Sequence, residues 1–127
     1  MKLVERHLIK ENHHLYPEID DLCFRSKNLY NLATYHQRQE FFKTGGVFSY
    51  EQLDPLLQGT EAYCALPAKV SQQVLIQVSK SWKSFFAART AYQENPERFY
   101  ALPSLPGYKH KQNGRNLLSY TAQAISR

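Results

Sequence analysis

The chain has 127 residues, of which 43% are hydrophobic and 21% charged, a composition that excludes a disordered chain and predicts a single folded domain over residues 1–127. Its net charge of +5 is unevenly distributed: residues 1–65 carry seven Lys and Arg against nine Asp and Glu, whereas residues 66–127 carry nine against two. Positive charge gathered in one half is typical of proteins that contact nucleic acid or an anionic membrane surface.

Missing patterns exclude several classes of protein. No segment approaches the roughly 18 consecutive apolar residues of a membrane span, so we expect no membrane partner. The N-terminal stretch has charges where an export signal would be apolar, and Cys23 and Cys64 form no CxxC pair, which favours reduced thiols and a cytoplasmic location. Without a GxSxG, P-loop or GxGxxG pattern or histidines at metal-ligand spacing, we expect no enzyme activity, catalytic residue, metal, cofactor or small-molecule substrate.

The first expected elements are a short strand within residues 1–11 and a long helix after it. Aliphatic and polar residues alternate loosely in the first segment, as in a strand. Tyr16-Pro17 suits the first turn of a helix and Thr44-Gly45-Gly46 suits its end, so we expect this helix to run to about Lys43. Its expected core-facing stripe is Leu15, Ile19, Leu22, Cys23, Ser26, Tyr30, Ala33, Gln37 and Phe41.

A second set of aromatic residues, Phe24, Tyr35 and Phe42, lies away from that stripe. Two apolar faces on one helix indicate two neighbours. The helix is then either a central one, covered on both sides, or one whose aromatic face is exposed for a partner or for stacked bases.

Short helices are expected between the two long ones. Ser49 begins a capping-box pattern, but Pro55 predicts that residues 53–57 continue only as a turn or a kinked segment. Thr60 begins a further single turn, which ends before Pro67.

The second long helix is expected from Ala68 to Asn95. Its expected core-facing stripe is Val70, Val74, Val78, Ser81, Phe85, Ala88 and Tyr92. The opposite side is polar and basic, and consists of Lys69, Gln72, Gln73, Ile76, Lys80 and Lys83. Surface helices usually interleave acids with lysines, yet no acidic residue occurs here before Glu94. Such a face indicates either an anionic partner or a merely solvated surface.

A compact basic loop follows, in the irregular segment 96–114 and its border with the last strand. We define the basic loop as residues 108–115, in which Tyr108, Lys109, Lys111 and Arg115 are the candidate phosphate and base contacts. Together with the basic helix face, this loop makes DNA or RNA the leading partner. The amides of Gln72 and Gln73 either read adenine edges or merely occupy helix positions.

The predicted fold is therefore mainly α within an α+β class. Two long helices with short helices between them form a small bundle over residues 15–95, and short strands in 1–11 and 115–127 belong to a partial β domain. No internal repeat is present.

The order of motifs resembles a known family. FRSKNLYNLATYHQRQEFF, LPAKVSQQVLIQVSKSWKSFF and LPSLPGYKHK, followed by a strand, are similar to the N-terminal region of OrfB/TnpB-type transposon proteins. The resemblance covers nearly the whole chain. It implies a region described as a helix-turn-helix DNA-binding domain, which in RNA-guided nucleases is a helical recognition lobe holding guide RNA and target duplex. It also implies that Lys69, Gln72 and Gln73 face the short motif that flanks the target.

The chain departs from that family in three ways. The RuvC-like domain with its three carboxylates and the zinc ribbon with paired CxxC motifs do not occur in this sequence, so we expect no cleavage by the chain alone. More than twenty residues separate the two long helices, whereas a helix-turn-helix uses a turn of about three or four. The hypotheses are thus a nucleic-acid-binding fragment, a module that docks on a separate nuclease chain, or a truncated remnant without its own function.

Overall fold

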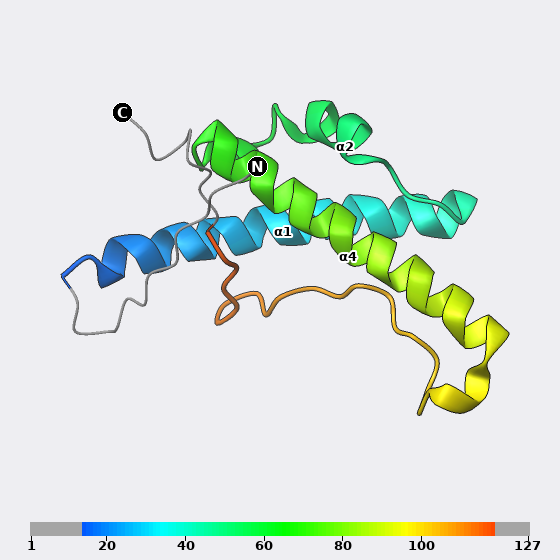
Figure 1. Ribbon diagram of the computed structural model, residues 1–127. Helices are drawn as coiled ribbons and strands as arrows, with labels where there is room; N and C mark the ends of the chain where they lie inside the picture. Colours follow the sequence, from blue (N-terminus) through cyan, green and yellow to red (C-terminus); the bar gives the residue numbers. More distant parts are fainter. Residues whose placement is uncertain (1–13, 119–127) are drawn as a thin grey trace, which may run out of the picture.

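The structure is a computed structural model in which residues 14–118 are described (Figure 1). In chain order the elements are α1 (Tyr16–Thr44), α2 (Tyr50–Leu57), α3 (Glu61–Cys64), α4 (Ala68–Glu94) and the 3₁₀ turn η1 (Pro96–Arg98). The predicted mainly helical fold with two long helices is confirmed, and the bounds of both long helices agree with the prediction to within one residue or so.

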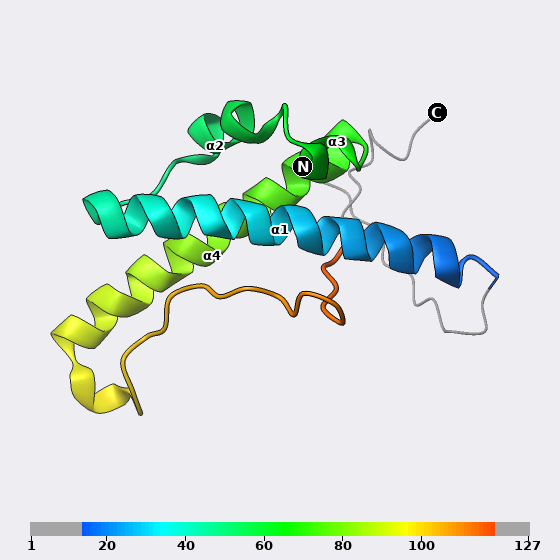
Figure 2. The ribbon, with the colours of Figure 1, turned by 180° about the vertical axis from the view of Figure 1, so that it is seen from behind.

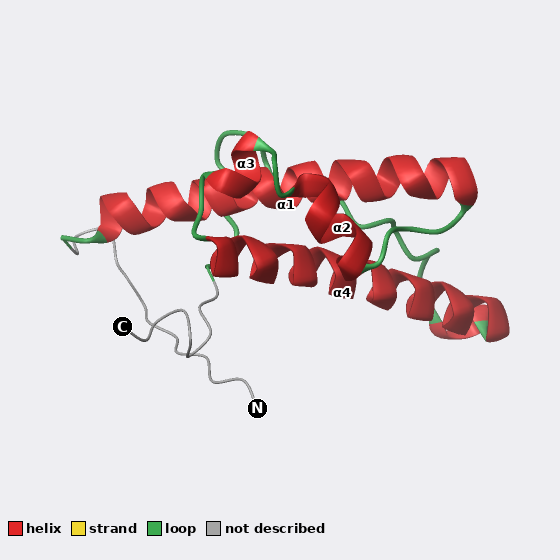
Figure 3. Cartoon of the chain, turned by 90° about the horizontal axis from the view of Figure 1, so that it is seen from above, coloured by secondary structure: helices red, strands yellow, loops and turns green. Residues whose placement is uncertain are grey.

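The two long helices cross and pack against each other, as Figures 1 and 2 show from opposite sides. On one side of the crossing lie α2 and α3. On the other side runs an extended segment, residues 99–118, which we call the strap. Figure 3 shows α1 and α4 side by side, so one face of α1 and one face of α4 point away from each other.

The hydrophobic core lies where α4 meets α1, α2 and α3. Its buried apolar residues are Leu29, Ala33, Leu53, Leu57, Tyr63, Leu66, Val70, Val74, Leu75, Val78, Trp82 and Phe85. At one end four aromatic rings cluster, with ring centroids 5.4–6.1 Å apart: Phe41, Trp82, Phe85 and Phe86. Burial of large apolar side chains at about 1.5–3 kcal/mol each makes this the main source of stability.

The helix ends follow the sequence signals. Gly45 ends α1 in the left-handed region, with φ of 83°, and donates its N–H to Phe41 O at 2.8 Å. Ser49 and Gln52 form the predicted capping box at the start of α2. Thr60 caps α3 through its hydroxyl. These three predictions are confirmed.

The prediction for Pro55 is wrong. The α2 helix continues through Pro55 to Leu57 without interruption. Proline removes one helical hydrogen bond, but Leu53 and Leu57, on either side of it, are both fully buried in the core. Their burial outweighs the lost bond in so short a helix.

The predicted core face of α4 is correct for Val70, Val74, Val78 and Phe85 but is misplaced around the helix. Ser81, Ala88 and Tyr92 are only half-buried, whereas the buried positions that the prediction missed are Ser71, Leu75 and Trp82. Contacts with α2 and α3 cause the difference, since these elements cover the side of α4 next to the α1 contact.

The core face of α1 is also only partly as predicted. Ser26, Ala33 and Gln37 are buried, but Leu15 is exposed, and the remaining members of the stripe are half-buried. Lys27 is buried although no sequence pattern indicates it. The strap causes this, because it covers the side of α1 on which Lys27 lies.

The predicted strands are not supported. The strand within residues 1–11 lies outside the described residues, as do residues 119–127 of the second one. Residues 115–118 are described and are not in a strand. Instead of pairing with another strand, Asn116 donates its backbone N–H to Cys23 O at 3.2 Å, and Leu117 O accepts a bond from Ser26 Oγ at 3.0 Å. This end of the strap therefore binds to α1.

Candidate nucleic-acid interface

The outer face of α4 carries the predicted positive charge. Lys69, Lys80 and Lys83 are all exposed, and we call them the lysine ridge. Within residues 14–118 no acidic side chain pairs with any of the three, since the ion pairs there use Arg25 and Arg115. At about 1.5 Å per residue the ridge spans roughly 21 Å along the helix, a length over which duplex DNA carries several phosphates on one side.

The two candidate glutamines occupy different surroundings. Gln72 lines a cavity of about 420 Å³ together with Tyr63 of α3, and its amide lies beside the Tyr63 hydroxyl. Gln73 is half-buried next to the ridge. Gln73 is therefore the better placed of the two to contact a ligand held by the lysines.

The basic loop is fixed to α1 through its backbone. The Asn31 side chain accepts the N–H of Lys109 at 2.8 Å and donates to the carbonyl of the same residue at 3.0 Å, as a neighbouring strand would. Lys27 Nζ donates to the Lys111 carbonyl, and Arg38 Nη1 donates to Pro106 O at 3.0 Å. The loop backbone is thus held through bonds that do not involve the side chains of Lys109 and Lys111.

Three of the loop's four candidate residues are exposed and available to a ligand. Tyr108 lies under the Arg38 guanidinium, whose central carbon is 5.5 Å from the ring centroid. Lys109 Nζ lies 5.0 Å from the centroid of the Tyr30 ring, and Lys111 is exposed. These cations have no carboxylate partner among the described residues.

Arg115 differs from the other candidates because its guanidinium is already engaged. Nε and Nη2 donate to the two carboxylate oxygens of Asp20 at 2.8 and 3.1 Å, and Nη1 donates to the carbonyls of Gln112 and Gly114. Four of its five N–H groups are thereby used. The same pairing lowers the pKa of Asp20 and raises the pKa of Arg115. These bonds join the loop to α1 and fix its conformation. The predicted contact of Arg115 with a phosphate stays a prediction.

Sequence reasoning gave no role to Lys27, Asn31 and Arg38, which position the loop. One signal could have found them. At about 100° per residue they fall within roughly 40° of one another around α1, in a row of two long cationic side chains and an amide. Such a row is suited to binding the carbonyl groups of an extended segment.

The ridge and the basic loop are not brought together. Lys83 lines a cavity between α2 and α4, whereas Lys109 and Arg115 line one on the strap side with Tyr30 and Gln77. The positive charge is therefore arranged on two separate surfaces, one on α4 and one on α1 with the strap.

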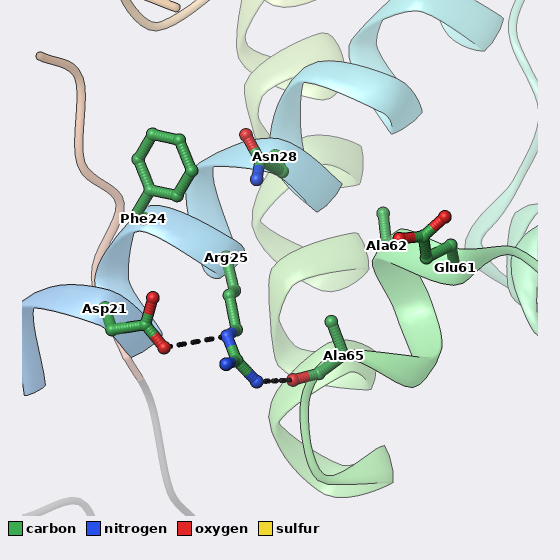
Figure 4. A pocket seen from close by; sticks show the side chains of 7 residues that line it. All are labelled: Asp21, Phe24, Arg25, Asn28, Glu61, Ala62 and Ala65. Atoms are coloured by element: carbon green, nitrogen blue, oxygen red, sulfur yellow. Dashed lines mark hydrogen bonds and ion pairs between the residues drawn. The ribbon is translucent and has the colours of Figure 1, made fainter. Parts of the chain in front are cut away.

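A third feature is an open cavity of about 590 Å³ between α1 and α3 (Figure 4). Arg25 closes its lower edge by pairing with Asp21 at 2.9 Å and donating to Ala65 O at 3.2 Å. Phe24 and Asn28 stand on the α1 side, and Glu61 faces them from α3. With two carboxylates and one guanidinium in its lining, this cavity does not favour a phosphate.

Comparison with protein-family models, with curated proteins and with solved structures finds no match. Within residues 14–118, no three His, Cys, Asp or Glu side chains are close enough to hold a metal ion. None of the helices in that range combines the length and apolar character of a membrane span.

Proposed function

We propose that the protein binds nucleic acid and that the lysine ridge of α4 and the exposed lysines of the basic loop, Lys109 and Lys111, hold its backbone phosphates. The observation that supports this best is the charge of α4. In a 27-residue helix the only carboxylate is at the last position, Glu94, while the lysines on the outer face are exposed and pair with no carboxylate within residues 14–118. Repulsion between unpaired lysines costs stability, and an anionic ligand would relieve it.

The proposal extends to the protein's place in a larger system. The motif order resembles the N-terminal region of OrfB/TnpB-type transposon proteins, and we propose that the chain acts as a recognition part for guide RNA or target DNA. In that role it binds rather than cuts, and a separate nuclease chain would supply the reaction. The support for this step is the sequence resemblance.

Salt dependence tests the binding itself. We expect the affinity for a labelled 20-base-pair duplex or a structured RNA, measured by fluorescence anisotropy, to fall steeply with salt, because each neutralised phosphate releases counterions. The three contacts of the ridge lysines alone give a slope of about −3 in a plot of log K against log salt concentration.

A charge-matched pair of double variants locates the contact. Lys80→Glu with Lys83→Glu removes two ridge cations, so we expect at least a tenfold loss of affinity and a slope less steep by about 2. Lys43→Glu with Arg98→Glu makes the same change in net charge at exposed sites outside the ridge and the loop. Equal losses in the two variants, or an affinity that does not respond to salt, would contradict the proposal.

A second candidate function, docking on another protein chain, is favoured by the strap's own apolar side chains. Leu102 and Leu117 are exposed by 69% and 73%, and Tyr100 is fully exposed. This candidate requires self-association or binding of an apolar dye by the isolated protein. A monomer in light scattering that binds no dye would contradict it.

A further inference from the structure

The face of α1 that points away from α4 carries a regular row of aromatic and planar polar side chains. Its members recur at steps of four and three residues: Phe24, Asn28, Asn31, Tyr35, Arg38 and Phe42. In Figure 2, α1 lies in front of α4 and no other helix passes in front of it. Tyr35 and Phe42 are exposed by 50% and 60%, so the reading of α1 as a helix covered on both sides is wrong at this end.

Arg38 organises the end of this row into a surface, which we call the platform: Tyr35, Arg38, Phe42 and Tyr108. The central carbon of the Arg38 guanidinium lies 5.6 Å from the centroid of the Phe42 ring and 5.5 Å from that of the Tyr108 ring. A hydrogen bond of 3.0 Å to Pro106 O fixes the guanidinium between them. One planar cation therefore contacts both the Phe42 ring of α1 and the Tyr108 ring of the strap, and Tyr35 lies on the same side of α1 as Arg38 and Phe42.

The charge around the platform is positive. From Asn28 to Thr44 the only carboxylate is Glu40, which lies roughly 140° around the helix from Tyr35. The strap contains no carboxylate at all between residues 99 and 118, and its Lys109 and Lys111, which follow Tyr108 along the strap, are exposed. An exposed aromatic surface with this surround complements a ligand that is both planar and anionic.

We propose that the platform binds an unpaired stretch of nucleic acid, whose bases stack on Tyr35, Phe42 and Tyr108 and whose phosphates contact Arg38 and the strap lysines. Bases in a duplex are already stacked on one another, so only an unpaired strand offers its rings to such a surface. Seven residues separate Tyr35 from Phe42, or roughly 10 Å along the helix, which is about three stacked-base steps of 3.4 Å.

This inference rests on the proposed function and deepens it by assigning a different form of nucleic acid to each face. The lysine ridge has no aromatic ring among its members and suits the phosphates of a paired segment. The platform is built on α1 and the strap, whereas the ridge is on α4, which lies beside α1 in Figure 3, and the platform suits an unpaired segment. The protein would then hold paired and unpaired segments at once, as at a junction between them.

The test measures, by fluorescence anisotropy, the affinity of the full-length protein for a labelled oligothymidine of twelve nucleotides and for a labelled duplex. Tyr35→Leu with Phe42→Leu changes two exposed side chains, and circular dichroism verifies that the helices remain. We expect at least a tenfold loss of affinity for the single strand, since stacking contributes about 1–3 kcal/mol per base. The affinity of this double variant for the duplex stays within twofold of the wild-type affinity. Its salt slope for the single strand equals that of the wild type because no charge is removed.

Two controls make the stacking step specific. Leu56→Ala removes an exposed apolar side chain from α2, away from the platform, and leaves both affinities unchanged. An oligonucleotide of the same length with abasic sites keeps the phosphates but lacks the rings, so we expect the wild-type protein to bind it at least tenfold more weakly than oligothymidine. The double variant distinguishes the two oligonucleotides less than the wild type does, because only the Tyr108 ring remains for stacking.

The outcomes separate the two proposals. If the wild-type chain binds neither ligand, the proposed function fails. If it binds the duplex with the expected salt dependence but the platform variant loses nothing on the single strand, or loses equally on both ligands, the proposed function stands and the platform inference is overturned.

Discussion

Lys27 is a buried cation, and buried lysines are rare in proteins. Its side chain is only 1% exposed, its ammonium lies 3.8 Å from the centroid of the Phe24 ring, and its hydrogen-bond partner is the carbonyl of Lys111 rather than a carboxylate. Burial, with the nearby charges of Arg115 and Lys111, lowers the pKa of Lys27. The charged side chain is therefore destabilising in the folded protein at neutral pH, while it positions the loop.

A pH-dependent stability difference follows at this residue. Because the pKa is lower in the folded than in the unfolded chain, wild-type stability rises as pH climbs through the folded pKa toward about 10.5, where the unfolded chain also loses the proton. We expect Lys27→Met to be more stable than the wild type by about 1 kcal/mol at pH 7, and the advantage to shrink by pH 10.

Urea unfolding of both proteins at the two pH values measures this difference. Lys43→Met, which changes an exposed lysine on the same helix, is the control and shows no such pH dependence. A Met variant that is less stable than the wild type at pH 7 would show instead that the bond to Lys111 O outweighs desolvation.

At the scale of single elements, the end of α1 depends on one backbone conformation. Gly45 has a φ of 83°, which costs other residues about 1–2 kcal/mol. We expect Gly45→Ala to lower the free energy of unfolding by about 1 kcal/mol. Its neighbour Gly46 has no positive φ, and a methyl group there would lie 3.8 Å from Thr44 Oγ1, so Gly46→Ala leaves stability nearly unchanged. Equal effects of the two changes in denaturant titrations would argue against a conformational cause.

Local signals predicted element ends well because the relevant physics is local. The capping box at Ser49 and the left-handed Gly45 involve only atoms within a few residues of chain. The predicted core face of α4 was rotated from the observed one because α2 and α3 cover part of this helix. The sequence of α4 alone does not determine on which side they pack. Pro55 shows the same limit, since the burial of Leu53 and Leu57 decides against a local helix-breaking preference.

At the scale of the whole molecule, Trp82 joins the core to the aromatic cluster. It is fully buried and contacts Phe41 of α1 as well as Phe85 and Phe86 of α4. We expect Trp82→Ala to cost about 3–5 kcal/mol, a large fraction of a domain's usual stability, and to lower the melting temperature by more than 10 °C or so. Thermal denaturation followed by circular dichroism measures this.

Trp82→Phe and Leu56→Ala complete that experiment. The indole N–H of Trp82 has no hydrogen-bond partner in the described part of the chain, so the Phe variant loses volume but no bond seen there and melts between the wild type and Trp82→Ala. Leu56 is exposed, and its removal has little effect. A Trp82→Ala protein as stable as Leu56→Ala would mean that the aromatic cluster is not the centre of the fold.

The candidate interface was predictable only in its composition. The exposed lysines of α4 follow from helical periodicity and the absence of acids, which are sequence properties. The docking of the strap on α1 was not predictable, because it depends on contacts such as those of Asn31 and Arg38 with residues 78 and 68 positions later in the chain. Arg115 likewise has an internal role that composition does not reveal, because its partner Asp20 lies far from it in the chain.

The way the strap is held also sets which positions are free to change. Side chains of Lys27, Asn31 and Arg38 bind backbone atoms of the strap, and backbone atoms are the same whatever the residue. Tyr108, Lys109 and Lys111 can therefore be replaced together, as in a combinatorial library, while the loop stays docked. The side chains that the loop presents to solvent can therefore be altered without redesigning the core.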